Sequence, residues 1–95
     1  MEHTVTFHLK HASGSSAEAE FLAAAAELAA IPGVEDFQIR RQVSPKNAHT
    51  FGMSMTFARD AYFQAYCSHP SHSEFVEKRW LAEVDDFQEA DFERL

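Results

Sequence analysis

Cysteine, glycine and long apolar runs are scarce in this chain of 95 residues. The single cysteine, Cys67, cannot form an intrachain disulfide, so a reducing cytoplasm is the expected compartment. The three glycines lie far apart and build no phosphate-binding loop. The longest mostly apolar stretch, residues 21–31, is too short to span a bilayer, and the first ten residues lack the apolar core of a signal peptide.

Positive charge is scarce too. Eight lysines and arginines stand against fifteen aspartates and glutamates, and the net charge is −7 with neutral histidines. The basic residues are scattered and form no positive stripe, so neither nucleic acid nor a membrane is an expected partner. Most of the excess acid lies in residues 74–95, which we interpret as a solvated acidic face.

Length and composition indicate a single domain over residues 1–95. Two domains would leave fewer than about 50 residues each, too few for separate cores without disulfides or metals. Apolar residues make up 45% of the chain and charged residues 24%, so we expect a globular chain rather than a disordered one. Nine phenylalanines indicate an aromatic core.

Alternation of apolar and polar residues predicts four strands. The first covers residues 3–10 and carries its apolar side chains and His3 on one face. The second covers residues 34–43, and the third, over residues 50–58, alternates most clearly. The apolar face of the first and third strands carries Val5, Phe7, Leu9, Phe51, Met53, Met55 and Phe57. A fourth, acidic strand is predicted over residues 87–93, although its alternation is poor.

Two helical segments are expected between the strands. The first is rich in alanine, begins where Ser15 and Glu18 have capping-box spacing, and ends at Pro32-Gly33. The second begins with Asp60 as its cap and is broken at His69-Pro70, because proline disfavours a helical residue before it.

After this break the helix is expected to resume, with Ser71 and Glu74 again at capping-box spacing. The resulting order of elements is β-α-β-β-α-β. With short connections and right-handed crossovers, this order predicts an α+β, ferredoxin-like fold. Its four-stranded antiparallel sheet has the strand order 4-1-3-2, and both helices cover one face.

Small and amphipathic side chains fill the other face of the predicted sheet, where a solvated face would carry more lysine and glutamate. They are Thr4, Thr6, His8, Gln38, Arg40, Gln42, Gly52, Ser54 and Thr56. We expect this sheet face to meet a second copy of the chain in a homodimer, with the two sheets about 10 Å apart. An ordinary solvated face is the alternative.

The segment Tyr66–His72 collects two imidazoles, a phenol and a thiol around the helix break. A histidine and a tyrosine can take a proton from the carbon next to a carbonyl and stabilise the enolate that forms. In this interpretation His72 is the general base and Tyr66 the neutral donor, whereas His69 holds the break. Packed or capping histidines are the alternative. No metal site is expected, because zinc-ligand spacing is missing, and no basic residue adjoins Cys67 to activate its thiol.

A cavity for a small apolar ligand is expected between the sheet and the helices. The predicted ligand-binding residues are His3, Val5, Phe7, Phe51, Met53, His69, Phe75 and Trp80. The alternative is that phenylalanine and methionine side chains fill this space completely. No cofactor is expected.

Several segments together share the pattern of one known family. They are His3–Phe7, Ile31–Val34, Val43–Asn47, Phe51–Phe57, Tyr66–Val76, Trp80 and Asp91–Phe92. The most specific part is His69-Pro70, followed after one residue by His72. On these segments nearly the whole chain resembles the stress-responsive A/B barrel (Dabb) family.

The resemblance implies a ferredoxin-like monomer that pairs through its sheets into a homodimer, a dimeric α+β barrel. Some plant members of the family are linked to stress and lack a defined activity. Members that cyclise polyketides are assigned a tyrosine and a histidine at positions similar to Tyr66 and His72, and His3 matches a pocket histidine of theirs. The chain differs from the cyclases at Ala23–Ala26, where they are expected to place bulkier pocket residues.

Two functions remain open. The chain is expected to be a small cytoplasmic stress-responsive A/B barrel protein without a defined activity, a homodimer with a pocket for a small hydrophobic ligand. The alternative is a cyclase-type or lyase-type enzyme that uses Tyr66 and His72 for enolate chemistry on a polyketide-like or other small carbonyl compound. The resemblance favours the first function, because it defines the fold more closely than the activity.

Overall fold

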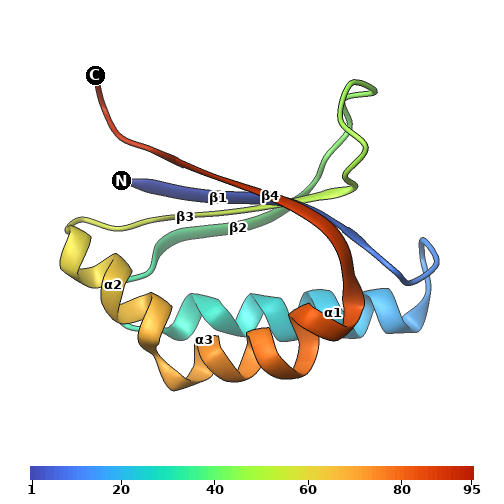
Figure 1. Cartoon of the computed structure of the whole chain (residues 1–95), viewed down its shortest axis with the longest axis horizontal. Helices are drawn as coiled ribbons and strands as arrows, with labels where there is room; N and C mark the ends of the chain where they lie inside the picture. The colour runs from blue at the N-terminus through green and yellow to red at the C-terminus, as the bar shows by residue number, and fades with distance from the viewer.

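The computed structural model describes residues 1–95 as one sheet with helices against one of its faces (Figure 1). The strands are β1 (Glu2–Leu9), β2 (Glu35–Arg41), β3 (Phe51–Thr56) and β4 (Val84–Phe92). The helical segments are α1 (Ser16–Ala26), the 3₁₀ turn η1 (Glu27–Ala30), α2 (Asp60–Ser68), α3 (Pro70–Phe75), the π-helical turn η2 (Val76–Trp80) and α4 (Leu81–Glu83). All strand pairs are antiparallel and the order is β2-β3-β1-β4, which confirms the predicted ferredoxin-like fold and strand order.

The central strand β1 sets the two faces of the sheet. Its odd-numbered residues from position 3 are buried beneath the helices, as the alternation of its sequence predicts. On one side β1 pairs with β3, which places Val5 opposite Met53 and Phe7 opposite Phe51. On the other side it pairs with the edge strand β4, which places Val5 opposite Glu89. These five side chains therefore have the parity of the face that the helices cover.

Helix α1 begins as its sequence indicates, but it ends at Ala26, and the 3₁₀ turn η1 continues the helical segment to Ala30, short of the predicted end at Pro32-Gly33. The Ser15 hydroxyl accepts a hydrogen bond from the Glu18 backbone N–H at 3.2 Å, and the Glu18 carboxylate accepts one from the Gly14 N–H at 3.1 Å. After η1, Gly33 has a φ of 91°. A Cβ atom at Gly33 would lie 2.9 Å from the Cβ of Tyr62 in α2. Both the backbone conformation and this close approach therefore require glycine.

The second helical segment differs from the prediction at both of its caps. Helix α2 begins at Asp60 itself, and its N-cap residue Arg59 makes no capping hydrogen bond through its side chain. The cap of α3 is His69 rather than Ser71, because the His69 ring Nδ1 accepts the Ser71 backbone N–H at 3.1 Å. Pro70 is the first residue of α3, where its missing N–H leaves no helical hydrogen bond unmade.

The strand ends shift by a few residues from the predicted ranges. Strand β2 ends at Arg41, since Gln42 begins a loop in which its side-chain amide donates to the Ser44, Asn47 and His49 carbonyls. Strand β4 begins at Val84, three residues before the predicted start, and ends one residue before the predicted end. Its alternation is poor because it lies at the edge of the sheet, with nearly all of its side chains exposed.

Aromatic rings dominate the core, in agreement with the phenylalanine content. The largest fully buried side chains are those of Tyr66, Phe7, Phe21, Phe57 and Met55. The π-helical turn η2 brings Trp80 against this core, where its ring lies 5.1 Å from the ring of Phe7. None of the helices is long and apolar enough to span a membrane.

Candidate active site

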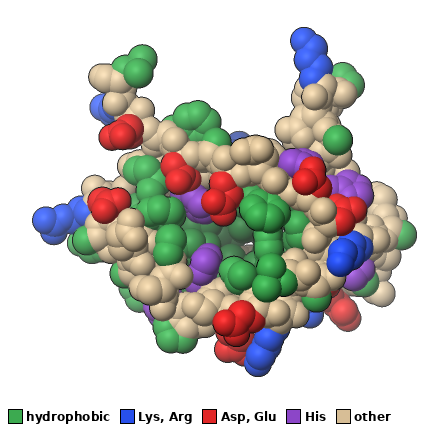
Figure 2. Space-filling view, in the orientation of Figure 1, with side chains coloured by type: hydrophobic (Ala, Val, Ile, Leu, Met, Phe, Trp, Pro, Cys, Tyr) green, Lys and Arg blue, Asp and Glu red, His purple; other side chains and the backbone are tan.

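A cavity of about 280 Å³ lies between the sheet and the helical layer. Its walls come from β1, β3, β4 and every helical segment from η1 to α4. The lining residues are His3, Val5, Leu28, Met53, Tyr66, His72, Phe75, Val76, Trp80, Leu81, Phe87 and Glu89. Figure 2 shows the molecule hollowed between the two layers, with hydrophobic and histidine side chains around the hollow and acidic side chains on its sheet side.

The cavity forms because neighbouring pairs of residues in the sheet differ in volume. At one pair, Phe7 lies opposite Phe51 with 5.8 Å between ring centroids, and Trp80 packs on Phe7. Aromatic rings fill the space beneath the sheet at this level. At the next pair, Val5 lies opposite Met53, and both side chains line the cavity. The sheet face is thus packed at one level and hollow at the next.

Tyr66 and His72 lie together in the cavity wall. Tyr66 comes from the last turns of α2 and His72 from the first turn of α3, so the break at His69-Pro70 folds one ring onto the other. The two ring centroids are 4.6 Å apart at an interplanar angle of 54°. No group of the protein hydrogen-bonds to the Tyr66 hydroxyl, which is therefore free to donate to a ligand.

Burial gives both side chains a preference for the neutral form. It lowers the pKa of His72 below its ordinary value of 6.5, while a hydrogen bond to the Cys67 backbone acts in the opposite direction. Burial, followed by the nearby Cys67 and Glu89, raises the pKa of Tyr66 well above its ordinary value. At neutral pH the site therefore combines an imidazole that can accept a proton with a phenol that can donate a hydrogen bond.

A second histidine lines the cavity from the sheet. The ring of His3 lies 6.3 Å from the ring of Tyr66, and its Nδ1 is hydrogen-bonded at 2.5 Å to a carboxylate oxygen of Asp91, its cross-strand neighbour in β4. A carboxylate partner keeps the proton on Nδ1 when the ring is neutral, which leaves Nε2 as an acceptor. His3 is thus held in a defined orientation at the cavity wall.

The structure groups five of the eight predicted ligand-binding residues around this cavity. They are His3, Val5, Met53, Phe75 and Trp80. The other three lie elsewhere: Phe7 and Phe51 are buried in the packed core, and His69 turns its ring to the backbone of Ser71. That any of these residues binds a ligand stays a prediction.

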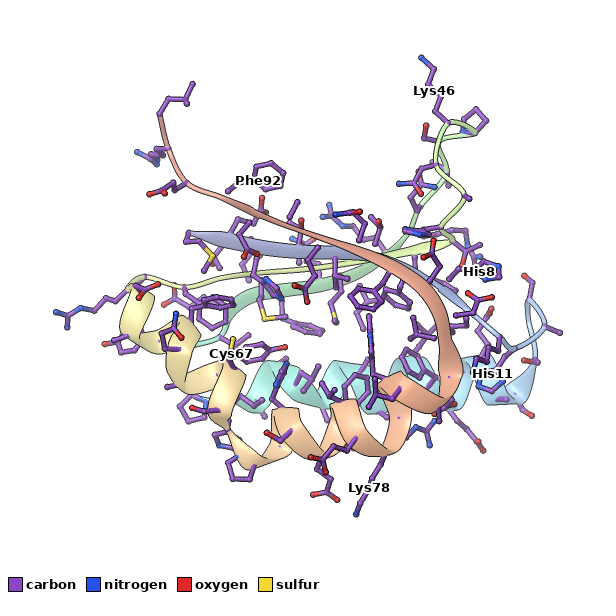
Figure 3. The ribbon with its side chains drawn as sticks, viewed as in Figure 1. His8, His11, Lys46, Cys67, Lys78 and Phe92 are labelled. Atoms are coloured by element: carbon purple, nitrogen blue, oxygen red, sulfur yellow. The ribbon has the colours of Figure 1, made fainter.

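Sequence reasoning missed the contributions of β4. Phe87 and Glu89 line the cavity, and Asp91 holds His3. All three have the same parity in β4, but two of them are acids, and the alternate positions include the apolar Ala90 and Phe92, so no apolar period-2 pattern marks the inward face. Cys67, labelled on α2 in Figure 3, is exposed. Partial desolvation, followed by the nearby Glu89 and Asp91, still raises the pKa of Cys67, so its thiol stays protonated at neutral pH.

The structure contains no group of three or more histidine, cysteine, aspartate or glutamate side chains placed to hold a metal ion. The cavity itself presents the imidazoles of His3 and His72 and the phenol of Tyr66 on a largely apolar wall, and these are groups of the kind that transfer protons and donate hydrogen bonds.

Comparison with protein-family models finds that the model of the stress responsive A/B barrel domain, Dabb, matches residues 1–94. The chain belongs to this family. A Dabb family protein with a ferredoxin-like fold from Mesorhizobium loti is 48% identical to it and superposes with a TM-score of 0.97, over 99% of this chain and 95% of that one. The resemblance inferred from the sequence is thereby confirmed. Comparison with curated proteins finds no match.

More distant solved structures share the fold. A dimeric ferredoxin-like protein of unknown function from Thermobifida fusca is 19% identical, with a TM-score of 0.78 over 96% of this chain and 87% of that one. A hydroxynitrile lyase from Passiflora edulis is also 19% identical, with a TM-score of 0.79 over 94% of this chain and 87% of that one. At these identities the likeness shows a common fold alone.

Proposed function

We propose that the cavity binds a small, mostly apolar carbonyl compound and that Tyr66 and His72 move a proton on it, in an enzyme of the cyclase or lyase type. The observation that carries this proposal is the contact of the two rings, 4.6 Å apart, in the wall of one cavity. A volume of about 280 Å³ lies at the lower end of small-molecule sites and suits a compact substrate. The apolar lining favours a substrate with a hydrocarbon body.

In the proposed reaction, the C–H bond next to the carbonyl breaks and its proton passes to the free ring nitrogen of His72. The bonding electron pair moves into the carbonyl, whose oxygen becomes an enolate. The Tyr66 hydroxyl donates a hydrogen bond to this oxygen and stabilises its charge in the buried site. The enolate carbon can then attack a second carbonyl of the same molecule, whose oxygen takes the proton back from His72, as in a cyclase. Alternatively, the enolate expels a leaving group from the neighbouring carbon as a C=C bond forms, and this group departs with the proton from His72, as in a lyase.

The assembly proposed for this activity is a homodimer through the outer face of the sheet. The Thermobifida fusca relative is described as dimeric, which supports the proposal. Phe92 is 56% exposed on β4 and points away from the helices (Figure 3). The β2–β3 loop and the C-terminal residues rise on the same side (Figure 1). Two such faces could therefore bury one another.

The dimer is tested by light scattering at micromolar concentration. We expect about 22 kDa for the protein, twice the chain mass of 10.8 kDa. Thr6→Lys should shift the protein toward the monomer, because a partly desolvated ammonium costs several kcal/mol at the interface. Ala23→Lys, on the exposed face of α1, is the matched control and should stay dimeric. A wild-type mass near that of one chain would refute the dimer.

Proton transfer is tested by exchange of the hydrogen next to the carbonyl of phenylacetone in D₂O, followed by NMR. We expect exchange above the buffer rate with the wild-type protein. His72→Ala should lower the rate about 10²–10⁴-fold, the usual contribution of a positioned base. Tyr66→Phe keeps the ring and removes only the donor, and should also lower the rate.

The matched control is His11→Ala, which removes a histidine that lies outside the cavity and outside the proposed dimer face, paired with Glu83 at 2.7 Å. Its exchange rate should equal that of the wild type. Binding of phenylacetone without any exchange would refute the enzyme and leave the ligand-binding homodimer as the function. Equal loss of exchange in His11→Ala and His72→Ala would refute the assignment of the base.

A further inference from the structure

Glu89 places a carboxylate in the wall of the cavity. It lies in β4 opposite Val5, so its side chain has the parity of the face covered by the helices, and it lines the cavity with Tyr66 and His72. The charge of Glu89 acts on both: it raises the pKa of Tyr66 and raises that of His72 against the effect of burial. Glu89 is therefore near the two groups proposed to react.

The other acidic side chains between residues 83 and 91 all have partners. Each pairs with a histidine: Glu83 with His11, Asp85 with His8, Asp86 with His49 and Asp91 with His3. The distances of these four pairs are between 2.5 and 2.8 Å. Glu89 forms none of the ion pairs of the protein, and its side chain accepts no hydrogen bond. One acid of this segment is thus left without a partner, and it is the one in the cavity.

No lysine or arginine lines the cavity to balance this charge. Of the two histidines in the wall, His3 already pairs with Asp91, and burial keeps His72 mainly neutral at neutral pH. The remaining lining is apolar apart from the Tyr66 hydroxyl and the indole N–H of Trp80, both of which are uncharged. A ligand in the cavity therefore meets the negative charge of Glu89, an exposed residue of the edge strand, with no lysine or arginine beside it.

We infer that Glu89 sets the substrate class of the proposed site: uncharged carbonyl compounds that carry a hydroxyl group enter the cavity, and carboxylates are excluded. A ligand carboxylate would meet the like charge of Glu89 with no cation nearby to compensate it. A ligand hydroxyl can instead donate a hydrogen bond to the unpartnered carboxylate, and hydrogen bonds to charged groups are stronger than neutral ones. This inference rests on the proposed function, because it names the substrates of the same site.

The position of Glu89 also agrees with the proposed chemistry. When His72 accepts the proton it becomes an imidazolium, and the negative charge of Glu89 attracts it. A substrate that brought its own carboxylate would place a second negative charge beside the developing enolate. An uncharged substrate avoids this repulsion, so the preference in binding and the requirement of the reaction point to the same compounds.

The test uses three probes with one aryl ketone body: phenylacetone, its 4-hydroxy derivative and its 4-carboxy derivative. Their dissociation constants are measured by calorimetry at pH 7.5 with the wild-type protein and with Glu89→Gln, which keeps the shape of the side chain. Glu77→Gln is the matched control, because it removes one negative charge from an exposed position of η2 outside the cavity.

With the wild type we expect the hydroxy probe to bind most tightly and the carboxylate at least about tenfold more weakly than phenylacetone. Glu89→Gln should tighten carboxylate binding about tenfold, reduce the advantage of the hydroxy probe, and leave phenylacetone within twofold. Glu77→Gln should change none of the three. Unchanged phenylacetone binding also shows that Glu89→Gln is folded.

The inference is overturned if the wild type binds the carboxylate as tightly as phenylacetone, or if Glu89→Gln keeps the full difference. It is also overturned if none of the probes binds. Proton exchange on the same samples separates it from the proposed function. Exchange without charge selectivity refutes the role of Glu89 alone, whereas charge-selective binding without exchange refutes the enzyme alone.

Discussion

The two adjacent residue pairs on the inner face of the sheet have opposite surroundings. The Phe7–Phe51 pair is covered by aromatic rings, whereas the Val5–Met53 pair borders the cavity. Both pairs have the same parity, the same strands and the same helical layer above them. Side-chain volume decides between a packed core and a site, and this difference is invisible to a pattern that records only apolar and polar residues.

The packed pair should govern stability. Phe7→Ala is expected to lower the free energy of unfolding by about 3–5 kcal/mol, because it leaves a cavity among rings that cannot close in. Val5→Ala should have a smaller effect, since it removes fewer atoms and enlarges a space that already exists. Urea unfolding of both variants measures the difference. Equal losses would show that the two levels are packed alike.

The hollow pair should govern ligand binding. Val5→Phe places at position 5 the same side chain that Phe7 has in the packed pair, and this larger ring is expected to fill part of the cavity. The affinity for phenylacetone should fall at least about tenfold, a difference of 1.4 kcal/mol. The free energy of unfolding should change less than in Phe7→Ala. Calorimetry measures the affinity. Val5→Ile adds only one methylene group to the cavity wall and should weaken binding less. Undiminished binding to Val5→Phe would place the ligand outside this cavity.

A smaller effect is expected in the dependence of stability on pH. Burial lowers the pKa of His72 in the folded protein, so the unfolded chain binds a proton more readily in the interval below pH 6.5. The His72 contribution to the free energy of unfolding should therefore be complete above pH 6.5 and decline as the pH falls toward the lowered folded pKa. Urea unfolding at pH 8 and pH 5 should show a smaller decline in His72→Gln than in the wild type. Equal declines would mean that His72 is not desolvated.

Much of the fold was predictable because local signals agree with it. The alternation in β1 and β3, the Ser15 cap of α1 and the break at His69-Pro70 each correspond to a feature of the structure. The error at the α3 cap has a simple cause. The Nδ1 of His69 lies within hydrogen-bond reach of the Ser71 backbone N–H and caps the helix. The capping-box pattern does not include histidine as a cap, so it pointed to Ser71 instead.

The site was predictable only in part. Tyr66 and His72 are close in sequence across a break, so their meeting could be anticipated. The pairing of β4 with β1 brings Glu89 to the cavity and Asp91 to His3, from which Asp91 lies 88 residues away along the chain. Such contacts depend on strand register at a sheet edge where exposed acids hide the alternation. The sequence therefore indicated the pair for which we propose proton transfer, but neither the charge of Glu89 nor the partner of His3.

The pH dependence of phenylacetone exchange tests the central claim most directly, because it reports the protonation of both proposed groups during the reaction. After subtraction of the buffer rate, we expect the catalysed rate to fall on acidification with a midpoint below pH 6.5, as His72 takes up a proton. The rate should then stay level to about pH 10, since burial keeps the Tyr66 phenol protonated beyond its ordinary pKa. A rate that is independent of pH on the acidic side, or that declines near pH 8, would contradict catalysis by a neutral His72 and a neutral Tyr66.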